Sequence, residues 1–403
     1  MSTTSVSSET LALDGGTPVR ERLLPYGRQA VEESDIQAVV DVLRSDWLTT
    51  GPKVEEFEKE FAAKVDAAYA VSFSSGTAAL HAAAFAAGLK AGDEAITTPL
   101  TFAATANCVL YQGATPVFAD VCDDTLNLDP EQVAKMISPR TRAILPVDYA
   151  GHPADLGAIM EMGRKRGVVI IEDACHALGA EYQGKRVGSI ADMTVFSFHP
   201  VKHITTGEGG MVATNNPKLA ETLRRFRNHG ISSDARQRQK SGQWHYEMVL
   251  LGFNYRLPDF ACALGIEQLK RLEANLLRRR AVAARYREAF RGVVGLIPPA
   301  VRPEANPAWH LYPIRLDLAA LTADRAQVFR ALRAENIGVN VHYIPVHLHP
   351  YYQERFGSQA GKFPKAENAY QRLISLPMFH SMTDADVDDV IHAVRKVVGH
   401  YTR

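Results

Sequence analysis

The sequence predicts an α/β fold, in which a large domain with a mostly parallel central sheet precedes a smaller C-terminal α+β domain. From about residue 70 to 215, short apolar runs alternate with segments of helical periodicity. The runs are apolar throughout, which is typical of parallel strands covered on both faces. From residue 305 this regular alternation stops, which indicates a second unit.

Each element follows from its own pattern. Expected strands of the large domain are 70–73, 94–97, 115–119, 143–147, 168–171, 194–198 and 210–213. Helical spacing predicts helices at 31–43, 54–65, 77–89, 103–111, 130–137, 156–166, 258–272 and 273–290. In the C-terminal part we expect strands at 311–316 and 338–342 and helices at 325–335 and 384–398. We therefore predict a flexible N-terminal arm (1–20), a large domain (21–274) and a small domain (275–403).

Composition excludes several classes of protein. The 403 residues carry 45 Lys and Arg against 45 Asp and Glu, so the zero net charge gives no reason to expect nucleic acid as a partner. The polar N-terminus lacks a secretory signal and no apolar run would cross a bilayer, so we expect no membrane partner and a cytoplasmic location. The four cysteines form no CxxC pair, a usage typical of a reducing compartment.

Two charged residues follow expected strands. Asp173 ends the apolar run 168–171 and should lie at the carboxyl edge of the sheet, where such folds bind ligands. A capping acid at a strand end is the alternative interpretation. Lys202 follows a later strand, flanked by apolar residues and glycines, and partial burial would make its amine a nucleophile toward carbonyls. An acid for a pyridinium nitrogen and a lysine for a Schiff base are what a pyridoxal 5'-phosphate (PLP) site requires.

A third segment, Ser74-Ser75-Gly76-Thr77, joins a strand to a helix. Free backbone N–H groups at such a turn suit a phosphate, although a tight turn needed only for packing would look the same. Neither GxGxxG nor a P-loop follows this strand, which weighs against a nicotinamide dehydrogenase.

Together these segments resemble the DegT/DnrJ/EryC1/StrS sugar aminotransferase family, whose fold is that of aspartate aminotransferase (PLP fold type I). The resemblance rests on SSGTAAL (74–80), EDACHA (172–177) and SFHPVKHITTGEGG (197–210). It continues through WLTTGP (47–52), PLTF (99–102), LGFNYR (251–256) and HYIPVH (342–347). Within the family the chain looks most similar to the UDP-4-keto-sugar aminotransferases of pseudaminic acid biosynthesis, and next to UDP-4-keto-L-arabinose aminotransferases.

The resemblance implies roles around the cofactor ring. Lys202 would form the Schiff base with PLP and, once freed, move the proton between cofactor and substrate. Asp173 would keep the pyridine nitrogen protonated. His176 would contact the ring hydroxyl, against the alternative of an ordinary core histidine. Phe102 would stack on the ring face, against the alternative of core packing.

The resemblance also implies how the cofactor phosphate and the substrates are held. Gly76, Thr77 and Ser197 would bind the phosphate, and Asn254 would reach it from a partner subunit, so a homodimer would share its active sites. Arg256 is the rival for that contact. The amino donor, by family, is L-glutamate. Nucleotide-sugar contacts are expected from Trp47, Thr49, Thr50, Arg256, His342, Tyr343 and His347.

Other interpretations stay open at this point. His342, His347 and His349 have no accompanying carboxylate or HExxH spacing, so no metal is expected. The cluster of Arg224, Arg225 and Arg227 is interpreted as a solvated helix face, with a grip on diphosphate as the alternative. Sugar 3-dehydratases of the family replace the Schiff-base lysine with histidine, whereas this chain keeps the lysine. A PLP-binding sensor without turnover is a candidate from another class.

Overall fold

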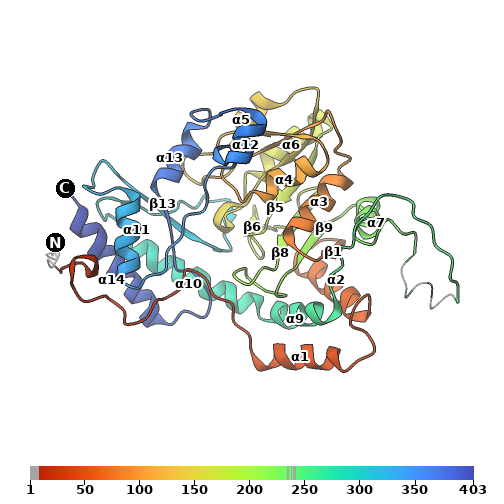
Figure 1. The fold of residues 1–403 in the computed structure, drawn as a ribbon, viewed down its shortest axis with the longest axis horizontal. Helices are drawn as coiled ribbons and strands as arrows, with labels where there is room; N and C mark the ends of the chain where they lie inside the picture. Colours follow the sequence, from red (N-terminus) through yellow and green to blue (C-terminus); the bar gives the residue numbers. More distant parts are fainter. Residues whose placement is uncertain (1–8, 234–235, 237, 239–241) are drawn as a thin grey trace.

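The computed structural model describes residues 9–233, 236, 238 and 242–403 (Figure 1). The strands of its main sheet are β1 (Tyr69–Phe73), β2 (Glu94–Thr97), β3 (Thr115–Phe118), β4 (Thr141–Leu145), β5 (Val169–Asp173), β8 (Met193–Ser197) and β9 (Gly210–Thr214). They form a seven-stranded sheet in the order β1-β9-β8-β5-β4-β2-β3. Only β9 runs antiparallel to its neighbours in this sheet, which confirms the predicted fold class.

Helices cover both faces of the sheet, as Figure 1 shows. Consecutive strand residues face opposite ways, so Ile171 packs into the cluster on one face while Ile170 packs into a cluster on the other. The first face carries α3 (Gly76–Ala86), α4 (Ala104–Tyr111) and α7 (Pro217–Phe226). The second carries α2 (Pro52–Lys64), α5 (Pro130–Met136), α6 (Leu156–Arg166) and α9 (Asp259–Lys270), with α1 (Glu33–Leu43) lying outside α9.

A long helix, α10 (Leu272–Phe290), leads to a smaller three-stranded sheet with the order β10-β12-β13. Its elements are β10 (Leu296–Ile297), β12 (Tyr312–Leu316), β13 (Leu373–Leu376), α11 (Arg325–Ala334) and α14 (Asp384–Tyr401). The strand expected over 338–342 does not form, because Gly338 hydrogen-bonds to Leu24 and only Asn340 bridges to β13. The remaining elements are short: η1 (Ala12–Asp14), η2 (Tyr149–Gly151), β6 (Glu181–Tyr182), β7 (Lys185–Arg186), β11 (Ala305–Asn306), η3 (Val346–Leu348), α12 (Pro350–Phe356) and α13 (Pro364–Arg372).

The expectation of a flexible arm does not describe residues 9–20, which lie against the C-terminal part of the chain. Leu11 is fully buried in the cluster formed by the small sheet and its helices. The buried carboxylate of Glu335 accepts the backbone N–H groups of Ala12 and Val19, at 2.9 and 3.0 Å. Lys396 pairs with the same carboxylate at 2.9 Å. We call residues 9–27 the N-terminal strap.

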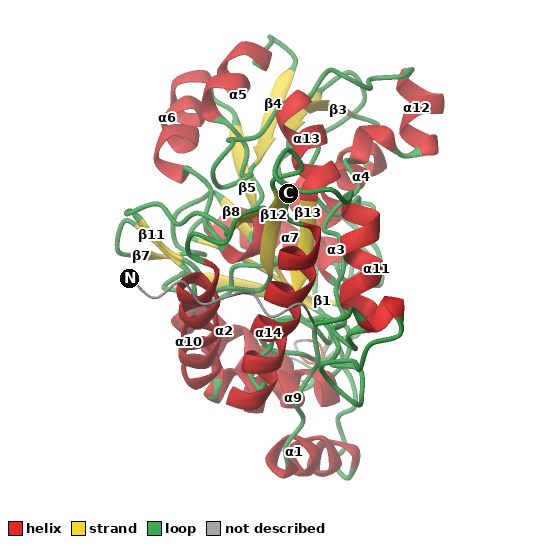
Figure 2. Cartoon of the chain, turned by 90° about the vertical axis from the view of Figure 1, so that its left-hand side faces the viewer, coloured by secondary structure: helices red, strands yellow, loops and turns green. Residues whose placement is uncertain are grey.

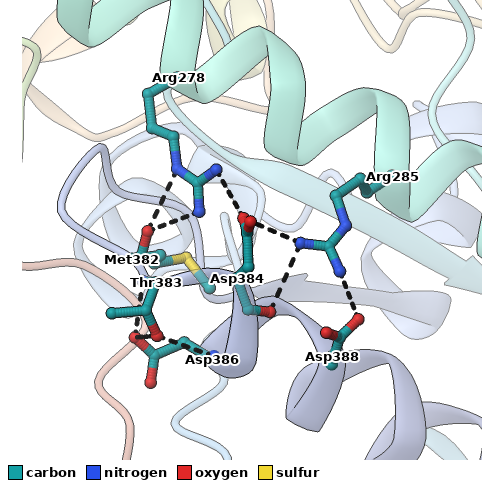
Figure 3. A network of polar contacts seen from close by, with 7 residues as sticks. All are labelled: Arg278, Arg285, Met382, Thr383, Asp384, Asp386 and Asp388. Atoms are coloured by element: carbon teal, nitrogen blue, oxygen red, sulfur yellow. Dashed lines mark hydrogen bonds and ion pairs between the residues drawn. The ribbon is translucent and has the colours of Figure 1, made fainter.

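The start of α14 is held to α10 by a polar network (Figure 3). Arg278 of α10 donates to the carbonyl of Met382 and pairs with Asp384 at 2.8 Å, and Arg285 pairs with the same Asp384 at 3.0 Å. Thr383 caps α14, since its hydroxyl accepts the N–H of the third helical residue. The cap satisfies the open N–H of Asp386, and Asp384 and Asp386 place carboxylates in the first turn, at the positive end of the helix.

Figure 2 shows the small sheet beside the last helices, with α14 and α10 crossing close together. Within the described ranges, no helix has the combination of length and apolar character that spanning a bilayer takes. All four cysteines have free thiols. Among the described residues there is no group of three or more side chains arranged to hold a metal ion.

Candidate active site

A cavity of about 630 Å³ opens at the carboxyl ends of β5 and β8. Its walls come from the strand ends, the starts of α3 and α4, the strap and the segment 340–343. Ligands bind at this edge in open α/β sheets because the loops and helix starts converge there. The predicted residues that line it are Gly76, Thr77, Phe102, Asp173, His176, Ser197, Lys202, His342 and Tyr343.

Asp173 ends β5 with its carboxylate buried on the α4 face of the sheet. The hydroxyl of Thr105, on α4, donates to its Oδ2 at 2.7 Å, and the N–H of Cys175 donates to its Oδ1 at 3.1 Å. Thr101 lies 2.8 Å from the Thr105 hydroxyl. The Thr105 hydroxyl has a single proton to donate. Its closer acceptor is the ionisable carboxylate of Asp173, since the carbonyl oxygen of Phe102 lies farther away, at 3.2 Å. Thr101 therefore donates to Thr105, and a chain of two hydroxyls orients the carboxylate.

Lys202 follows β8 and lines the same cavity as Asp173. Burial lowers the pKa of the Lys202 amine, and the neighbouring Asp173 and Cys175 side chains act against that shift. A lowered pKa increases the fraction of uncharged amine at neutral pH, which is the form that attacks a carbonyl. The neighbouring His203 is instead buried, with its Nε2 3.0 Å from the carbonyl oxygen of Ala308. Of these two adjacent residues, only the lysine lines the cavity.

The start of α3 forms an anion-binding corner of the cavity. Ser75 caps the helix by accepting the N–H of Ala78, which leaves the N–H groups of Gly76 and Thr77 at the open helix end. A Cβ at Gly76 would lie 3.0 Å from the Cβ of Ser197, so glycine leaves the space between them free. Gly210 is constrained as well, because a Cβ there would lie 2.5 Å from the Ser75 carbonyl oxygen. Ser75, Gly76, Thr77 and Ser197 thus line a corner of the cavity that could cradle a phosphate.

His176 lies beside Tyr343, whose hydroxyl is 2.9 Å from its Nε2. Burial, and then Lys202, lowers the pKa of His176 well below its ordinary value, so the ring is neutral. Its buried Nδ1 has no hydrogen-bond partner among the described residues. His310 packs against it with ring centroids 4.4 Å apart. His176 lines the cavity, so its unpartnered Nδ1 is a candidate contact for a polar ligand atom.

Phe102 is 61% exposed although Thr101 and Ala104 are buried, and Phe102 lines the cavity. Such an exposed aromatic face suits stacking on a planar ring. His342 is buried nearby, hydrogen-bonded through Nδ1 to Ser375 at 2.9 Å, and burial lowers its pKa to about 4. Tyr26 of the strap lies against the His342 ring with centroids 5.4 Å apart.

Several predicted residues lie outside this cavity. Thr50 and Arg256 line a second cavity of about 570 Å³, which also contains the side chains of the cluster Arg224, Arg225 and Arg227. Asn254 is exposed, and its backbone forms an isolated β-bridge with Asn228. The side-chain amide oxygen of Asn228 accepts a hydrogen bond from Arg256 at 2.7 Å. Trp47 and Thr49 line neither cavity.

The structure does not bring His347 to the cavity, contrary to the expected substrate contact. The ring is 1% exposed and packs against Phe118 and Phe363. Its Nε2 lies 3.0 Å from Glu367. Because the buried imidazole contacts Phe118 of β3 and Glu367 of α13, it holds α13 against the body of the protein.

Other lining residues escaped the sequence analysis. Tyr26, Thr105, His310 and Asn340 come from four separate stretches of the chain. Thr105 lies within the expected helix 103–111, but the pattern of that helix did not mark it as a site residue. Tyr26 carried no local pattern, since a long-range pairing of Leu24 with Ile337 places it there.

These residues fit PLP on features of the cavity itself. The cradle at Gly76 and Ser197 would take the phosphate, Asp173 the ring nitrogen, and the open Nδ1 of His176 a ring substituent. When bound, PLP supplies an aldehyde for an amine and a ring that withdraws electrons from the reacting carbon. Lys202, which lines the same cavity, would be the group that holds or releases a proton there. The fold and site thus define a PLP-dependent enzyme of fold type I.

Comparison with known proteins agrees with this class. The model of the DegT/DnrJ/EryC1/StrS aminotransferase family matches residues 29–395, and the chain belongs to this family. The Bacillus subtilis spore coat polysaccharide biosynthesis protein SpsC is 46% identical, over 94% of this chain and 98% of its own length. Helicobacter pylori PseC, an aminotransferase involved in pseudoaminic acid biosynthesis, superposes with a TM-score of 0.87 at 33% identity, covering 94% of this chain and all of the other.

The PLP-form of the Streptococcus pneumoniae putative sugar aminotransferase Spr1654 superposes with a TM-score of 0.87 at 31% identity, covering 94% of this chain and 99% of that one. The protein is therefore a PLP-dependent sugar aminotransferase.

Proposed function

We propose that the protein transfers an amino group, with L-glutamate as donor, to C4 of a UDP-4-keto-6-deoxy-N-acetylhexosamine. The observation that carries this proposal is the single cavity that joins Lys202, Asp173 and the phosphate cradle to a polar wall. Asn340, His342 and Tyr343 on that wall offer hydrogen-bonding groups suited to the hydroxyl and acetamido substituents of a sugar. The likeness to PseC supports an acetamido sugar. A UDP-4-keto-L-arabinose acceptor is the alternative.

The test of this function is direct product analysis. Purified enzyme loaded with PLP is incubated with L-glutamate and, in parallel, UDP-4-keto-6-deoxy-N-acetylhexosamines and UDP-4-keto-L-arabinose. Mass spectrometry and NMR then identify the product and the configuration of its new amine. We expect gain of the amine on the acetamido sugar. Amination of the arabinose derivative alone would contradict the substrate proposed, and loss of oxygen without nitrogen gain would indicate dehydration.

A matched variant tests the lysine. Lys202→Ala removes the only lysine on the described cavity wall and should abolish both the visible absorbance of bound cofactor and amine transfer. Lys53→Ala, at a surface i,i+3 ion pair, is the control and should keep both. A Lys202→Ala enzyme that still aminates would refute the assignment. A wild-type enzyme that binds PLP yet never passes nitrogen to any keto sugar would favour a sensor.

We further propose a homodimer whose active sites are shared between subunits. Asn254 and Arg256 do not line the cavity that contains Lys202 of the same subunit. Any contact they make with a cofactor phosphate must therefore be with the cofactor bound in another subunit. The neighbouring segment also exposes apolar side chains, with Trp244 85% and Leu251 74% accessible. Exposed side chains of this size in one segment are typical of a surface that another molecule covers.

Mixing inactive variants tests the shared site. In a mixed dimer, one subunit carries Lys202→Ala and the other carries Asn254→Ala/Arg256→Ala. One active site would then lack the lysine and both phosphate contacts, whereas the other active site would be intact. Equal mixing after dissociation should restore about a quarter of wild-type activity, because half of the dimers are mixed and each has one working site. No recovery, with mixed dimers confirmed by a tagged subunit, would show that each subunit completes its own site.

A further inference from the structure

Two buried carboxyl groups lie directly behind the cofactor-facing acid. Asp148 follows β4, and Glu172 precedes Asp173 on β5; the side chains of Asp148 and Glu172 are both 0% exposed. Because strand residues alternate, Glu172 lies on the opposite face of β5 from Asp173. The strand ends are joined, since the N–H of Asp148 donates to the carbonyl of Asp173 at 3.0 Å and the N–H of Asp173 donates to that of Pro146 at 2.8 Å.

Each carboxyl group has one satisfied oxygen. Oδ1 of Asp148 accepts the N–H of Ala154 at 2.9 Å, and Oε2 of Glu172 accepts the hydroxyl of Thr194 at 2.7 Å. The other oxygens, Oδ2 and Oε1, are buried and have no donor among the described residues. The two side chains are nevertheless within hydrogen-bonding reach of each other. Two ionised carboxylates only accept, so a proton on one of them is needed to make that bond.

The charges around the pair favour keeping that proton. Burial, and then Glu172, raises the pKa of Asp148 well above its ordinary value, and burial also raises the pKa of Glu172. Asp173 is the further titratable group that affects the pKa of both carboxyls. Because it is also acidic, its charge raises both pKa values. The equally buried Asp35 differs, because Arg271 pairs with it at 2.6 Å. A buried acid without a cationic partner avoids the free-energy cost of a buried charge by keeping its proton.

We propose that Asp148 and Glu172 share one proton and act as a positioning pair for Asp173. The shared proton links the end of β4 to β5 and so fixes the strand end that carries Asp173. The pair keeps one net negative charge behind Asp173, which favours a proton on the cofactor nitrogen that Asp173 faces. This role rests on the cofactor assignment and is independent of which sugar the enzyme uses.

The stability of the cofactor-free protein tests the shared proton. An unfolded carboxyl loses its proton above about pH 4, whereas the folded pair keeps one, so this pair lowers the stability of the fold as pH rises from about 5 to 8. Asp148→Asn places a permanent donor toward Glu172 and removes that dependence. The ratio of the variant's unfolding equilibrium constant to that of wild type should therefore fall about tenfold for each unit by which the pH rises. Glu172→Gln should behave alike.

The control is Asp35→Asn, which disrupts the ion pair with Arg271 and should lower stability at every pH in this range. Parallel pH profiles for wild type, Asp148→Asn and Glu172→Gln would overturn the shared proton. If either variant does not fold, infrared spectroscopy of wild type decides: a protonated-carboxyl band should persist at pH 8, and its absence would refute the proposal.

The positioning role has a second measurement, on protein loaded with PLP. Asp148→Asn/Glu172→Gln removes the negative charge with little change in shape. Without that charge, the visible absorbance of the bound cofactor should change at a pH lower than in wild type, by on the order of one pH unit. Suppose that the double variant has lost the pH dependence of stability but its absorbance changes at the same pH as in wild type. That result would show that the pair does not act on the cofactor.

Discussion

Removing the Thr105 hydroxyl tests how Asp173 is held. Thr105→Val keeps the branched shape and deletes the donor that lies 2.7 Å from Oδ2 of the carboxylate. Asp173 is 5% exposed, so water cannot readily replace that donor. The carboxylate would keep its bond from the Cys175 N–H but could rotate about it.

The expected magnitude follows from the type of hydrogen bond. A bond to a charged, buried group contributes about 1.5 to 3 kcal/mol, which corresponds to a loss of about 10- to 160-fold in kcat. Thr101→Val removes a bond between two neutral hydroxyls, one step further from the carboxylate. That change contributes about 0.5 to 1.5 kcal/mol, or roughly 2- to 10-fold.

The assay is the amine-transfer rate at saturating donor and acceptor, together with the affinity for PLP. We expect kcat to fall in the order wild type, Thr101→Val, Thr105→Val. Thr222→Val is a matched control, because that hydroxyl bonds only to a carbonyl of its own surface helix. If Thr105→Val keeps kcat within about twofold of wild type with cofactor bound, the hydroxyl chain does not orient Asp173 and the reasoning is wrong.

Three further changes have defined outcomes. Gly210→Ala places a Cβ 2.5 Å from the carbonyl oxygen of Ser75, so the phosphate cradle must shift and PLP should bind at least about tenfold more weakly in an absorbance titration. Glu335→Ala leaves the buried Lys396 unpaired and should cost about 3 to 5 kcal/mol in urea unfolding; a Glu335→Ala/Lys396→Met double variant that recovers nothing would contradict this. Thr383→Ala removes the cap of α14 and should cost about 1 kcal/mol, read as a lower urea midpoint, whereas an unchanged midpoint would show that the cap contributes nothing.

The main sheet was predictable because its strands are continuous apolar runs separated by helices. The expected runs at 94–97 and 168–171 match β2 and β5 within two residues, and β13 in the small sheet was missed. Its sequence, Leu-Ile-Ser-Leu, is short and directly follows a helix, so no turn signal separates the two.

The candidate site divides in the same way. Asp173, Lys202 and the turn at Gly76 were found because each lies at or shortly after the carboxyl end of a strand, and the topology brings such positions to one edge. Tyr26 and His310 reach the cavity through contacts between distant segments, which leave no local pattern. His347 shares a short motif with His342, yet only the structure shows that it is buried against Phe363 and does not line the cavity.

The N-terminal strap also determines when the cavity wall can form during synthesis. Leu24 hydrogen-bonds to Asn336 and Gly338, and the carbonyl of Tyr26 accepts the N–H of Met378. A ribosome releases the first residues of these pairs long before the last ones exist. Nascent chains stalled before residue 378 should therefore leave this edge of the cofactor pocket open, and chaperones would encounter the chain in that state.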